Sequence, residues 1–556
     1  MRLGSDEKTR DYIAKGWWGE ETLLDLFDAT ARAHPERIAV ADPLNREEID
    51  GLPPRRLTYG ELDEEATRAG RRFAALGLVP GDVIAFQLPN TVEQVVLYLA
   101  AMRRGLVISP VPIQWREHEL ADVLGFAGAK AAVTSESVRD FAHADLLVTI
   151  AKRLPGLEHI LIIGKGAPEG AQRFDALEEK EPAPHTPHVS DAVTICWTSG
   201  TEARPKGVPR HHNHWISAGI ASVDAARLDS GCVILNPFPF INMAAIGGSF
   251  VPWLLTGGTL VQHHPFDLPT FLKQIPMEKV NYTVAPPALL TMLLKQEDML
   301  AKLDLSSLKS MGSGSAPLPP FMVKAWQEDY GLPIVNIFGS NEGTCLFSGA
   351  DDVPDPEERA RFFPRFGVAG LDWPAARMSG RIETILADIQ TGEEITGAET
   401  PGELLLKGAT VFEGYFRQGE PGAPESPFDA DGFFHTGDMF QIAGPGARYY
   451  QFVERAKDII IRGGMNISPS ELDVALTAHP DVAEAAVAAY ADEVMGEKIC
   501  AYVVPAAEKT VTLDALTDHL RQQGLAAYKL PEKLVILESL PRNPLGKVLR
   551  RELSSS

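Results

Sequence analysis

The sequence predicts an α/β protein. A large N-terminal domain of mostly parallel, helix-flanked sheets carries a β-rich subdomain, and a small α+β domain follows it. Three observations lead to this prediction. Short β-branched and apolar runs alternate with amphipathic stretches over about the first 340 residues, which is typical of βαβ units. From about residue 367 the strand-like runs follow one another with glycine turns, and a compact segment of mixed type begins at residue 457.

The N-terminal half alternates between helix-like and strand-like segments. Residues 57–77 have helical spacing after Thr58, and the strand-like run 83–88 follows them. A second amphipathic stretch at 91–104 precedes the apolar run LVISPVPI. Parallel strands need crossover segments of this kind between them. We therefore expect the later runs to extend parallel sheets; they are AAVTS, HILIIG, residues 193–198, GTLVQH, NYTVAP and LPIVNIFG.

The C-terminal third has a different texture. The runs RIETILADIQTGEEI, GELLLKG and ARYYQFVER predict short antiparallel strands joined at glycine turns. The charged interruption VERAKD separates two apolar stretches, and we place the main domain boundary there. The prediction is a large domain over residues 1–456, with its β-rich subdomain over about 367–456, and a small domain over residues 457–556.

The composition is that of a globular protein with a large core, since 45% of the residues are hydrophobic and 23% are charged. The net charge of −23 opposes binding to nucleic acid or to an anionic membrane through a general basic field. No apolar run reaches the roughly 18 residues of a membrane span, and no targeting signal is recognisable. The four cysteines form no CxxC pair, which fits a reducing compartment. We expect a cytoplasmic monomer or homodimer that binds no nucleic acid.

One glycine-rich segment, TICWTSGTEARPKGVPR, has the residue types of a phosphate-binding loop. Hydroxyl and backbone N–H groups of such a loop wrap around phosphate oxygens, and a lysine adds positive charge. The segment is not a Walker A loop, because Pro205 precedes the lysine and Gly207 follows it. Taken alone, it is compatible with a phosphate site or with an ordinary surface loop. The residues concerned are Thr198, Ser199, Gly200, Thr201 and Lys206.

TSGTEARPKG closely resembles the phosphate-binding motif of the adenylate-forming superfamily, which contains acyl-CoA synthetases, adenylation domains of peptide synthetases and beetle luciferases. Four further segments match that superfamily in order. SGSAPLPP resembles its adenine-side segment, NIFGSNEG its aromatic-Gly-x-Thr-Glu motif and PRNPLGKVLRREL its C-terminal lysine motif, while HTGD is identical to its ribose motif. The resemblance covers essentially the whole chain and is of the acyl-CoA synthetase (AMP-dependent synthetase-ligase) type.

The resemblance implies a two-step reaction. A carboxylate first attacks the α-phosphate of ATP, which gives an acyl-adenylate and pyrophosphate, and a thiol such as that of CoA then attacks the activated carbonyl. Glu342 would hold Mg²⁺, a hard cation that suits a carboxylate, and Asn341 would contact the α-phosphate. The other implied ATP and AMP contacts are Thr198, Ser199, Gly200, Thr201, Lys206, Gly314, Ser315, Ala316, Pro317, Asn336, Phe338, Gly339, Ser340, Asp438, Phe452 and Arg455.

The same resemblance assigns roles to the C-terminal segment. Lys547 would be the catalytic lysine of the first step, since a compact cation on a flexible stem suits a carboxylate and an α-phosphate. The small domain would be mobile and would rotate about a hinge at Lys457 between the two steps. Its other face would bring Gly463 and Gly464, which leave room for a pantetheine arm beside the backbone. Such a rotation gates the reaction and does not by itself accelerate the chemistry.

Three positions depart from the superfamily pattern. Ala203 stands where glycine is usual, Asn341 replaces threonine before Glu342, and Glu454 replaces glycine before Arg455. An alanine that must adopt a positive φ costs on the order of 1 kcal/mol. These departures motivate one alternative from another class, a nucleotide-binding homologue without turnover.

Three histidines follow the phosphate loop at His211, His212 and His214. A metal site, a packing or acyl-pocket role for one of them, and a plain structural role are all compatible with the sequence.

The segments expected around the acid are mostly apolar. They contain no arginine or lysine placed to pair with a second carboxylate, and no aspartate placed to meet an amino group. We therefore predict a hydrophobic monocarboxylic acid of aromatic, alicyclic, terpenoid-like or medium-chain type. CoA is the expected thiol, and a separate carrier protein is the alternative acceptor. The predicted acyl-pocket residues are Trp215, Phe240, Asn242, Met243 and Gly339.

Overall fold

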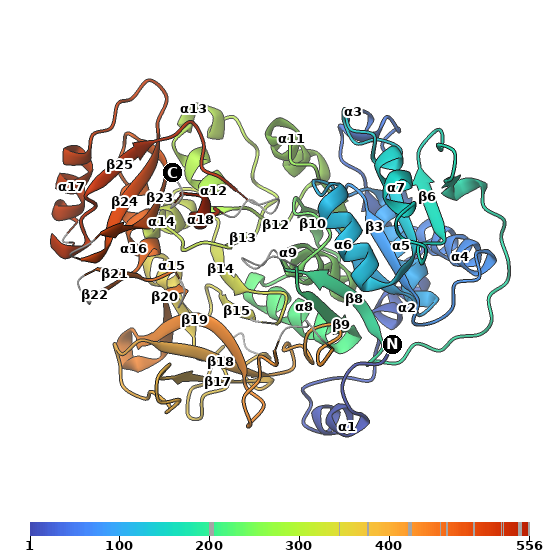
Figure 1. The fold of residues 1–556 in the computed structure, drawn as a ribbon, viewed down its shortest axis with the longest axis horizontal. Coiled ribbons are helices and arrows are strands. Elements are labelled where there is room, and N and C mark those ends of the chain that lie inside the picture. Colours follow the sequence, from blue (N-terminus) through green and yellow to red (C-terminus); the bar gives the residue numbers. More distant parts are fainter. Residues whose placement is uncertain are drawn as a thin grey trace.

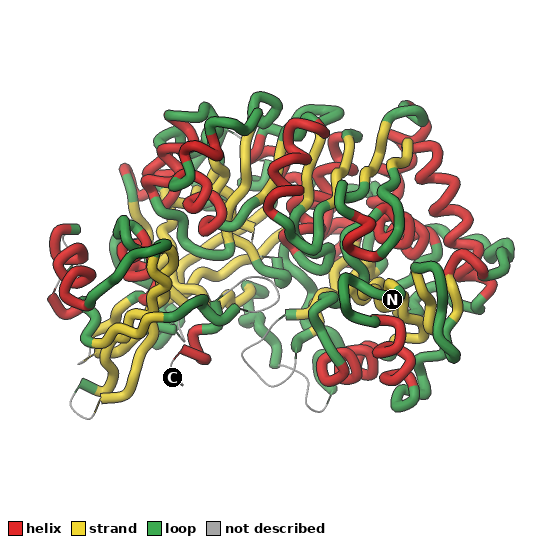
Figure 2. Tube along the Cα trace, turned by 90° about the horizontal axis from the view of Figure 1, so that it is seen from above, coloured by secondary structure: helices red, strands yellow, loops and turns green. Residues whose placement is uncertain are grey.

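The computed structural model describes residues 1–198, 205–343, 345–374, 377–420, 425–455, 458–462, 465–492, 495–523, 525, 527–542 and 548–553. Its strands form four sheets, two of which are large and mostly parallel (Figure 1). Figure 2 shows that helices surround the strands of these two sheets. The predicted α/β fold class is therefore confirmed.

The first large sheet has seven strands in the order β7-β6-β5-β3-β4-β8-β9. All neighbours are parallel except β8 and β9, which form an antiparallel edge. The strands are β3 (Val83–Gln87), β4 (Val107–Pro110), β5 (Ala129–Ser135), β6 (His159–Ile163), β7 (Gln172–Arg173), β8 (Ala192–Trp197) and β9 (Gly207–His211).

The second large sheet has eight strands in the order β15-β14-β13-β12-β10-β11-β1-β2. Its interior is parallel, and one antiparallel strand closes each edge. The strands are β1 (Ile38–Ala41), β2 (Arg56–Thr58), β10 (Val233–Asn236), β11 (Thr259–Gln262), β12 (Tyr282–Val284), β13 (Ser310–Gly314), β14 (Ile334–Gly339) and β15 (Cys345–Ser348).

Amphipathic helices cover these sheets. Helix α4 (Tyr59–Ala75) begins with a capping box, because Thr58 and Glu61 each accept the other's backbone N–H. Helices α5 (Val92–Arg103) and α8 (His212–Ala226) are buried along most of their length and share one core with both sheets. The other helices of this part are α1 (Asp6–Ala14), α2 (Leu23–Ala33), α3 (Arg46–Asp50), α6 (Glu117–Ala127), α7 (His143–Ala151), α9 (Met243–Ala245), α10 (Val251–Thr256), α11 (Leu268–Glu278), α12 (Pro287–Leu294), α13 (Glu297–Leu300), α14 (Pro320–Glu328) and α15 (Pro356–Arg361), with 3₁₀ turn η1 (Phe174–Ala176) and π-helix η2 (Ile246–Phe250).

The two smaller sheets follow in sequence. The third is entirely antiparallel, in the order β16-β20-β19-β18-β17, as the glycine-punctuated runs predict. In the fourth, β23 and β24 form a long antiparallel pair, and helix α17 crosses over from β24 to the parallel strand β25. The elements are β16 (Phe362–Pro364), β17 (Ile382–Ala387), β18 (Gly402–Gly408), β19 (Phe434–Ala443), η3 (Pro445–Ala447), β20 (Tyr449–Arg455), β21 (Ile460–Arg462), β22 (Met465–Ile467), α16 (Pro469–Thr477), β23 (Val482–Asp492), β24 (Gly496–Pro505), α17 (Leu513–Gln522), η4 (Ala527–Lys529), β25 (Lys533–Ile536) and α18 (Arg550–Leu553).

The position of the domain boundary stays a prediction, since residues 456 and 457 lie outside the described ranges. Within the described ranges, no helix is both long enough and apolar enough to cross a membrane.

Candidate active site

Three aromatic side chains meet where the second and third sheets adjoin. Phe338 lies in the last two residues of strand β14, and its ring lies 4.9 Å from that of Phe440 on β19 in an edge-on arrangement. Phe452 on β20 lies 5.8 Å from the Phe338 ring. Phe338 and Phe452 both stay half-buried. They form an aromatic surface of the kind on which a flat ring stacks.

The loop after β14 is pressed against the chain at residues 410–412. The Glu342 carbonyl accepts the N–H of Phe412 (2.9 Å), and the Thr410 hydroxyl donates to the Gly343 carbonyl (2.7 Å). Gly343 has φ +113°, and a Cβ there would lie 2.0 Å from the Thr410 carbonyl oxygen. This position therefore requires glycine. The contacts fix Glu342 in a half-buried position.

The carboxylate of Glu342 contacts a tyrosine whose ring also lies near a lysine from another segment. The Tyr415 hydroxyl donates to Glu342 Oε1 (3.2 Å). The Lys206 Nζ lies 5.4 Å from the centre of the Tyr415 ring. A carboxylate and an ammonium group thus flank one phenol, beside the chain that enters the predicted phosphate loop. This combination suits a phosphate group and a hard cation.

Asn341 connects this loop to two other regions. Its side-chain oxygen accepts the N–H of Met243 (3.0 Å), and its amide nitrogen donates to the Trp197 carbonyl (3.4 Å). Trp197 ends β8 just before the predicted phosphate loop, and Met243 begins α9. The side chain that replaces the usual threonine therefore bridges the predicted phosphate loop and the predicted acid pocket.

A buried arginine that the sequence analysis missed supports Asn341. Arg210 donates to the carbonyls of Asn341 (2.6 Å), Thr410 (2.6 Å) and His214 (3.3 Å). Its guanidinium also lies 4.9 Å from the ring centre of Trp215. Arg210 is completely buried in strand β9. An arginine inside an otherwise strand-like run was the available signal, because a buried charge is retained only where it is hydrogen-bonded.

The two ends of the predicted phosphate loop are pinned together. Thr198 donates its N–H to the Lys206 carbonyl (3.0 Å), and the Thr198 hydroxyl accepts the N–H of Lys206 (3.4 Å). Eight positions named in the sequence analysis lie outside the described residues, and these are Ser199, Gly200, Thr201, Ala203, Lys457, Gly463, Gly464 and Lys547.

Asp438 and Arg455 face each other across strands β19 and β20. Arg455 Nε lies 3.2 Å from Asp438 Oδ1, and the two residues are register partners. The Asp438 side chain is 6% exposed, whereas that of Arg455 is 39% exposed. The Thr436 hydroxyl accepts the N–H of Asp438 (3.1 Å), which fixes the turn. The pair lies close to the aromatic surface, since Phe440 and Phe452 belong to the same two strands.

The end of β13 lies against β14. A Cβ on Gly314 would lie 2.2 Å from the Ile337 carbonyl, and Ser315 has φ +69°. This close approach leaves residues 315–317 exposed beside Phe338 and its neighbours. Asn336 is buried, and its amide donates to the carbonyls of Arg359 and Ala360 (3.0 Å each). Asn336 therefore positions strand β14 through helix α15.

The predicted acid-pocket residues fall into two groups. Met243 is half-buried, and a Cβ on Gly247 would lie 2.6 Å from its sulfur and 3.6 Å from Trp215. Asn242 uses its side-chain oxygen to cap α9. Phe240 and Trp215, by contrast, have no exposed surface, and Phe240 packs between Tyr98 (4.8 Å) and Phe250 (5.0 Å) in the aromatic core. Helix α9 thus presents half-buried Met243 at the Asn341 side, and Gly247 of the π-helix η2 packs against the Met243 sulfur.

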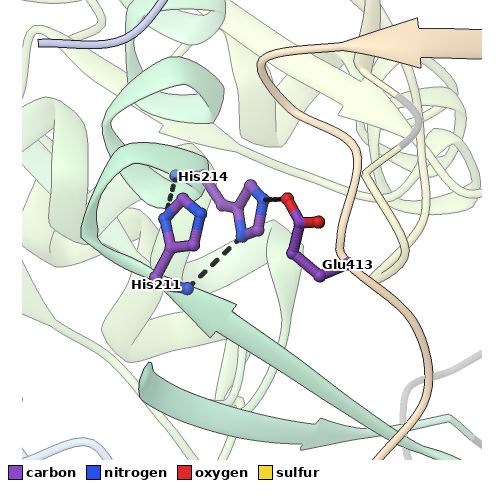
Figure 3. Close-up of side chains that lie close together, drawn as sticks. All are labelled: His211, His214 and Glu413. Carbon is purple, nitrogen blue, oxygen red and sulfur yellow. Dashed lines mark hydrogen bonds and ion pairs between the residues drawn. The ribbon is translucent and has the colours of Figure 1, made fainter. Parts of the chain in front are cut away.

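Figure 3 shows the histidine cluster, in which His211, His214 and Glu413 lie close together. His211 and His214 stack at 3.5 Å, and each ring accepts the other's backbone N–H. His214 Nε2 lies 3.6 Å from Glu413 Oε1, so three potential metal ligands are close together. Lys8 already places its ammonium 2.9 Å from the same carboxylate oxygen.

Burial and the positive charges around this cluster hold the pKa of His214 well below its usual range. Lys8 and Arg210 disfavour a cation at this place for the same electrostatic reason. The geometry supports a structural role for the cluster, in which the histidines cap α8 and present the His214 carbonyl to Arg210.

A family model described as AMP-binding enzyme matches residues 27–416, and one described as AMP-binding enzyme C-terminal domain matches residues 471–547. The chain is 30% identical to medium-chain fatty-acid–CoA ligase of Escherichia coli K12, over 98% of this chain and 92% of that protein. It is also 30% identical to salicyl-AMP ligase / salicyl-S-ArCP synthetase of Mycobacterium tuberculosis, over 98% and 93%. ATP-bound MatB from Rhodopseudomonas palustris superposes with a TM-score of 0.77 at 26% identity, over 96% of this chain and 99% of that one.

Proposed function

The chain belongs to the AMP-binding enzyme family, and we propose that it is an ATP-dependent acid–thiol ligase that forms acyl-CoA. In the first step a carboxylate oxygen bonds to the α-phosphorus of ATP, and the bond from that phosphorus to pyrophosphate breaks. In the second step the sulfur of CoA bonds to the acyl carbon, AMP leaves with the bonding electrons, and the thiol proton goes to solvent. One observation carries the proposal: Asn341, in the loop of Glu342, bridges the end of β8 and the wall at Met243.

The nucleotide would lie along the third sheet. Its adenine would stack at Phe338 and Phe452, with residues 314–317 as the second wall. Asp438 would accept hydrogen bonds from the ribose hydroxyls, because an ionised carboxylate is an acceptor at both oxygens. Arg455, which already pairs with Asp438, would hold that carboxylate in place and remain exposed enough to reach the ribose.

The phosphates would lie between Lys206 and Glu342. The carboxylate of Glu342 fits Mg²⁺, because it is held beside the phosphate loop and oxygen ligands suit that ion. Bound there, Mg²⁺ would neutralise charge on the departing pyrophosphate. Lys206 would add a second positive charge, and the Thr198–Lys206 hydrogen bonds would keep the loop ends closed around the phosphates.

The acid would lie on the Met243 side of Asn341. Half-buried Met243 packs there beside the buried residues Trp215 and Gly247, and none of these three side chains is charged. This supports a hydrophobic monocarboxylic acid. The relatives carry the names of fatty-acid, salicyl and indoleacetate ligases, and all three name acids with an apolar body. We propose the same broad class for this chain.

Lys547 would orient the carboxylate and the α-phosphate during the first step, and rotation of residues 457–556 about Lys457 would replace it with the loop of Gly463 and Gly464. We therefore expect Lys547→Ala to abolish adenylation and to leave thioester formation from supplied acyl-adenylate largely intact. Pyrophosphate release and thioester formation are measured separately. Equal loss of both steps would contradict the two-face model.

A carrier protein is the second candidate for the thiol, because one relative is named salicyl-S-ArCP synthetase. The deciding experiment offers a panel of carboxylic acids with ATP and Mg²⁺, and either CoA or a phosphopantetheinylated carrier. Pyrophosphate is followed, and products are identified by mass spectrometry. A CoA thioester supports the proposal, whereas acyl-adenylate that passes to the carrier alone favours the second candidate. ATP binding without turnover on any acid would favour a non-catalytic homologue.

A further inference from the structure

A hollow of about 510 Å³ lies among helices α4 and α5, the end of strand β6 and turn η1. This volume is within the range of about 300–1,000 Å³ that is typical of small-molecule sites. None of its lining residues belongs to the candidate active site. Figure 1 shows α4 and β6 at one end of the molecule, away from β14 and β19. Its apolar lining is Leu52, Ala69, Val96, Leu97, Ile162, Ile163 and Phe174.

The charged residues of the hollow are mainly positive. Five cationic side chains line it against three carboxylates, although the chain as a whole carries a net charge of −23. Such a local reversal of sign attracts anions. The cations are Arg55, Arg68, Arg72, Lys165 and Arg173, and the carboxylates are Glu65, Glu93 and Asp175.

All three carboxylates are already paired. Glu93 lies 2.7 Å from Arg46 and 3.0 Å from Arg55. Burial alone would raise the pKa of Glu93, but these two guanidinium groups hold it below its usual value. Arg55 also pairs with Glu65, and Arg173 pairs with Asp175. The negative charges are therefore matched within the wall.

The other three cations of the hollow are weakly paired or unpaired within the described part of the chain. Arg68 and Arg72 lie one turn apart on α4. The Arg72 side chain is 19% exposed and forms one long ion pair with Glu179 (3.7 Å), and its Nε is buried without a hydrogen-bond partner among the described residues. Within the described part of the chain, neither Arg68 nor Lys165 forms an ion pair. An underused guanidinium beside a hollow is costly unless something accepts its hydrogen bonds.

The wall that carries Lys165 is held in place. The Glu136 carboxylate accepts the N–H groups of Lys165 (2.8 Å) and Gly166 (2.9 Å), and Arg173 donates to the Lys165 carbonyl (3.4 Å). The Arg72 guanidinium lies 5.5 Å from the ring centre of Phe174. Positive charge and apolar floor are thus both preorganised, which lowers the entropy that a ligand loses on binding.

We propose that this hollow is a second ligand site, which binds a small organophosphate with an apolar ring. Arg68 and Arg72 would take the phosphate, since guanidinium groups match phosphate oxygens in pairs. Lys165 would close the other side as a point charge. The ring would lie against Leu52, the member of the apolar lining that is only half-buried. The site is independent of acid activation.

The test uses phenyl phosphate, titrated into the full-length protein by calorimetry. We expect saturable binding, which weakens at least tenfold in Arg72→Gln and further in Arg68→Gln/Arg72→Gln. Arg71→Gln is the matched control, because Arg71 stands on the same helix but pairs with the exposed Glu181 outside the hollow. Its affinity should equal that of the unaltered protein. Thermal unfolding checks that each variant is folded.

Two further measurements distinguish this site from the proposed nucleotide site and from nonspecific binding of anions. Binding of phenyl phosphate should persist in Asp438→Asn, and inorganic phosphate should bind more weakly than phenyl phosphate. Unchanged affinity in Arg72→Gln would overturn the proposal, as would loss of binding in Asp438→Asn with retention in Arg72→Gln. Equal affinity for phenyl phosphate and inorganic phosphate would overturn the role of the apolar floor.

Discussion

The carboxylate of Glu454 accepts the backbone N–H of Ser470 at 2.8 Å, and so ties strand β20 to the first turn of helix α16. The same oxygen accepts the Ser468 hydroxyl (3.2 Å), and the other oxygen accepts the Arg455 N–H (2.9 Å). Glu454 is 2% exposed. The residue that departs from the usual glycine thus bridges the segments before and after the proposed hinge.

We predict that Glu454→Ala lowers the free energy of unfolding by about 1 kcal/mol, which is the typical loss when a helix cap is removed. If residues 457–556 rotate, the ratio of the adenylation rate to the thioester-forming rate should change as well. Both rates and the unfolding midpoint are measured. Glu471→Gln is the control, since Glu471 starts the same helix but pairs with Lys529 at the surface. An unchanged rate ratio in Glu454→Ala would argue against a role in domain rotation.

Asp438→Asn is expected to raise the KM for ATP by roughly tenfold to a hundredfold, because hydrogen bonds to a charged group contribute about 1.5–3 kcal/mol. The acid's KM should change little. Asp431→Asn, an exposed aspartate before the same strand, serves as the control. Initial rates over a range of ATP concentrations give both constants. An Asp438→Asn enzyme with unaltered ATP dependence would exclude the ribose role.

Glu342→Gln is expected to lower the rate of pyrophosphate release by about a hundredfold or more, as loss of a charge-stabilising group at a reacting phosphate does. Raising the Mg²⁺ concentration should recover part of the rate. Tyr415→Phe removes the hydroxyl that donates to Glu342 and leaves the carboxylate, so its loss should be much smaller. Similar losses in the two variants would mean that Glu342 acts through Tyr415 and not on the metal.

We predict that the buried histidine His212 makes the folded protein less stable in acid. Burial lowers its pKa from 6.5 to about 4, and its Nδ1 accepts the Leu23 N–H (3.2 Å). Asp191 and Asp25 oppose this shift, and His188 adds to it. Below pH 6.5 the unfolded chain binds a proton that the folded protein refuses until about pH 4. The free energy of unfolding should therefore fall as the pH drops through this window, by up to about 1.4 kcal/mol per pH unit from this residue.

The measurement is denaturant unfolding between pH 7 and pH 4. His212→Asn should flatten the pH dependence, whereas His118→Asn, at an exposed position on α6, should not. A pH dependence equally steep in His212→Asn and in the unaltered protein would show that other groups carry the effect.

The alternation of apolar runs and helices was sufficient to predict the parallel sheets. It was not sufficient to predict the direction of the strands at the sheet edges. Strands β2, β9 and β15 run antiparallel, and each is short, so its direction is set by the neighbouring strand that it pairs with. Periodicity within three to five residues carries no such information.

The residues of the candidate active site also fall into those that the sequence could predict and those that it could not. Motif residues such as Glu342 and Asp438 were predictable because each belongs to a local run of characteristic residues. The partners of Arg210 and Tyr415 were not predictable, since their contacts join residues far apart in the chain; Arg210 reaches Thr410, two hundred residues away. Burial of Phe240 in the core was likewise invisible, because an apolar residue in a loop has the same local pattern in a core and in a pocket.

Arg210 donates hydrogen bonds to three chain segments at once, namely the loop of Glu342, the stretch before Tyr415 and the first turn of α8. We therefore expect the choice of acid to change most easily through substitutions at residues such as Met243, which contacts Asn341 but, within the described residues, has no hydrogen bond with Arg210. We expect substitutions that disturb Arg210 to shift Asn341, and so to affect the proposed phosphate and acid sites together.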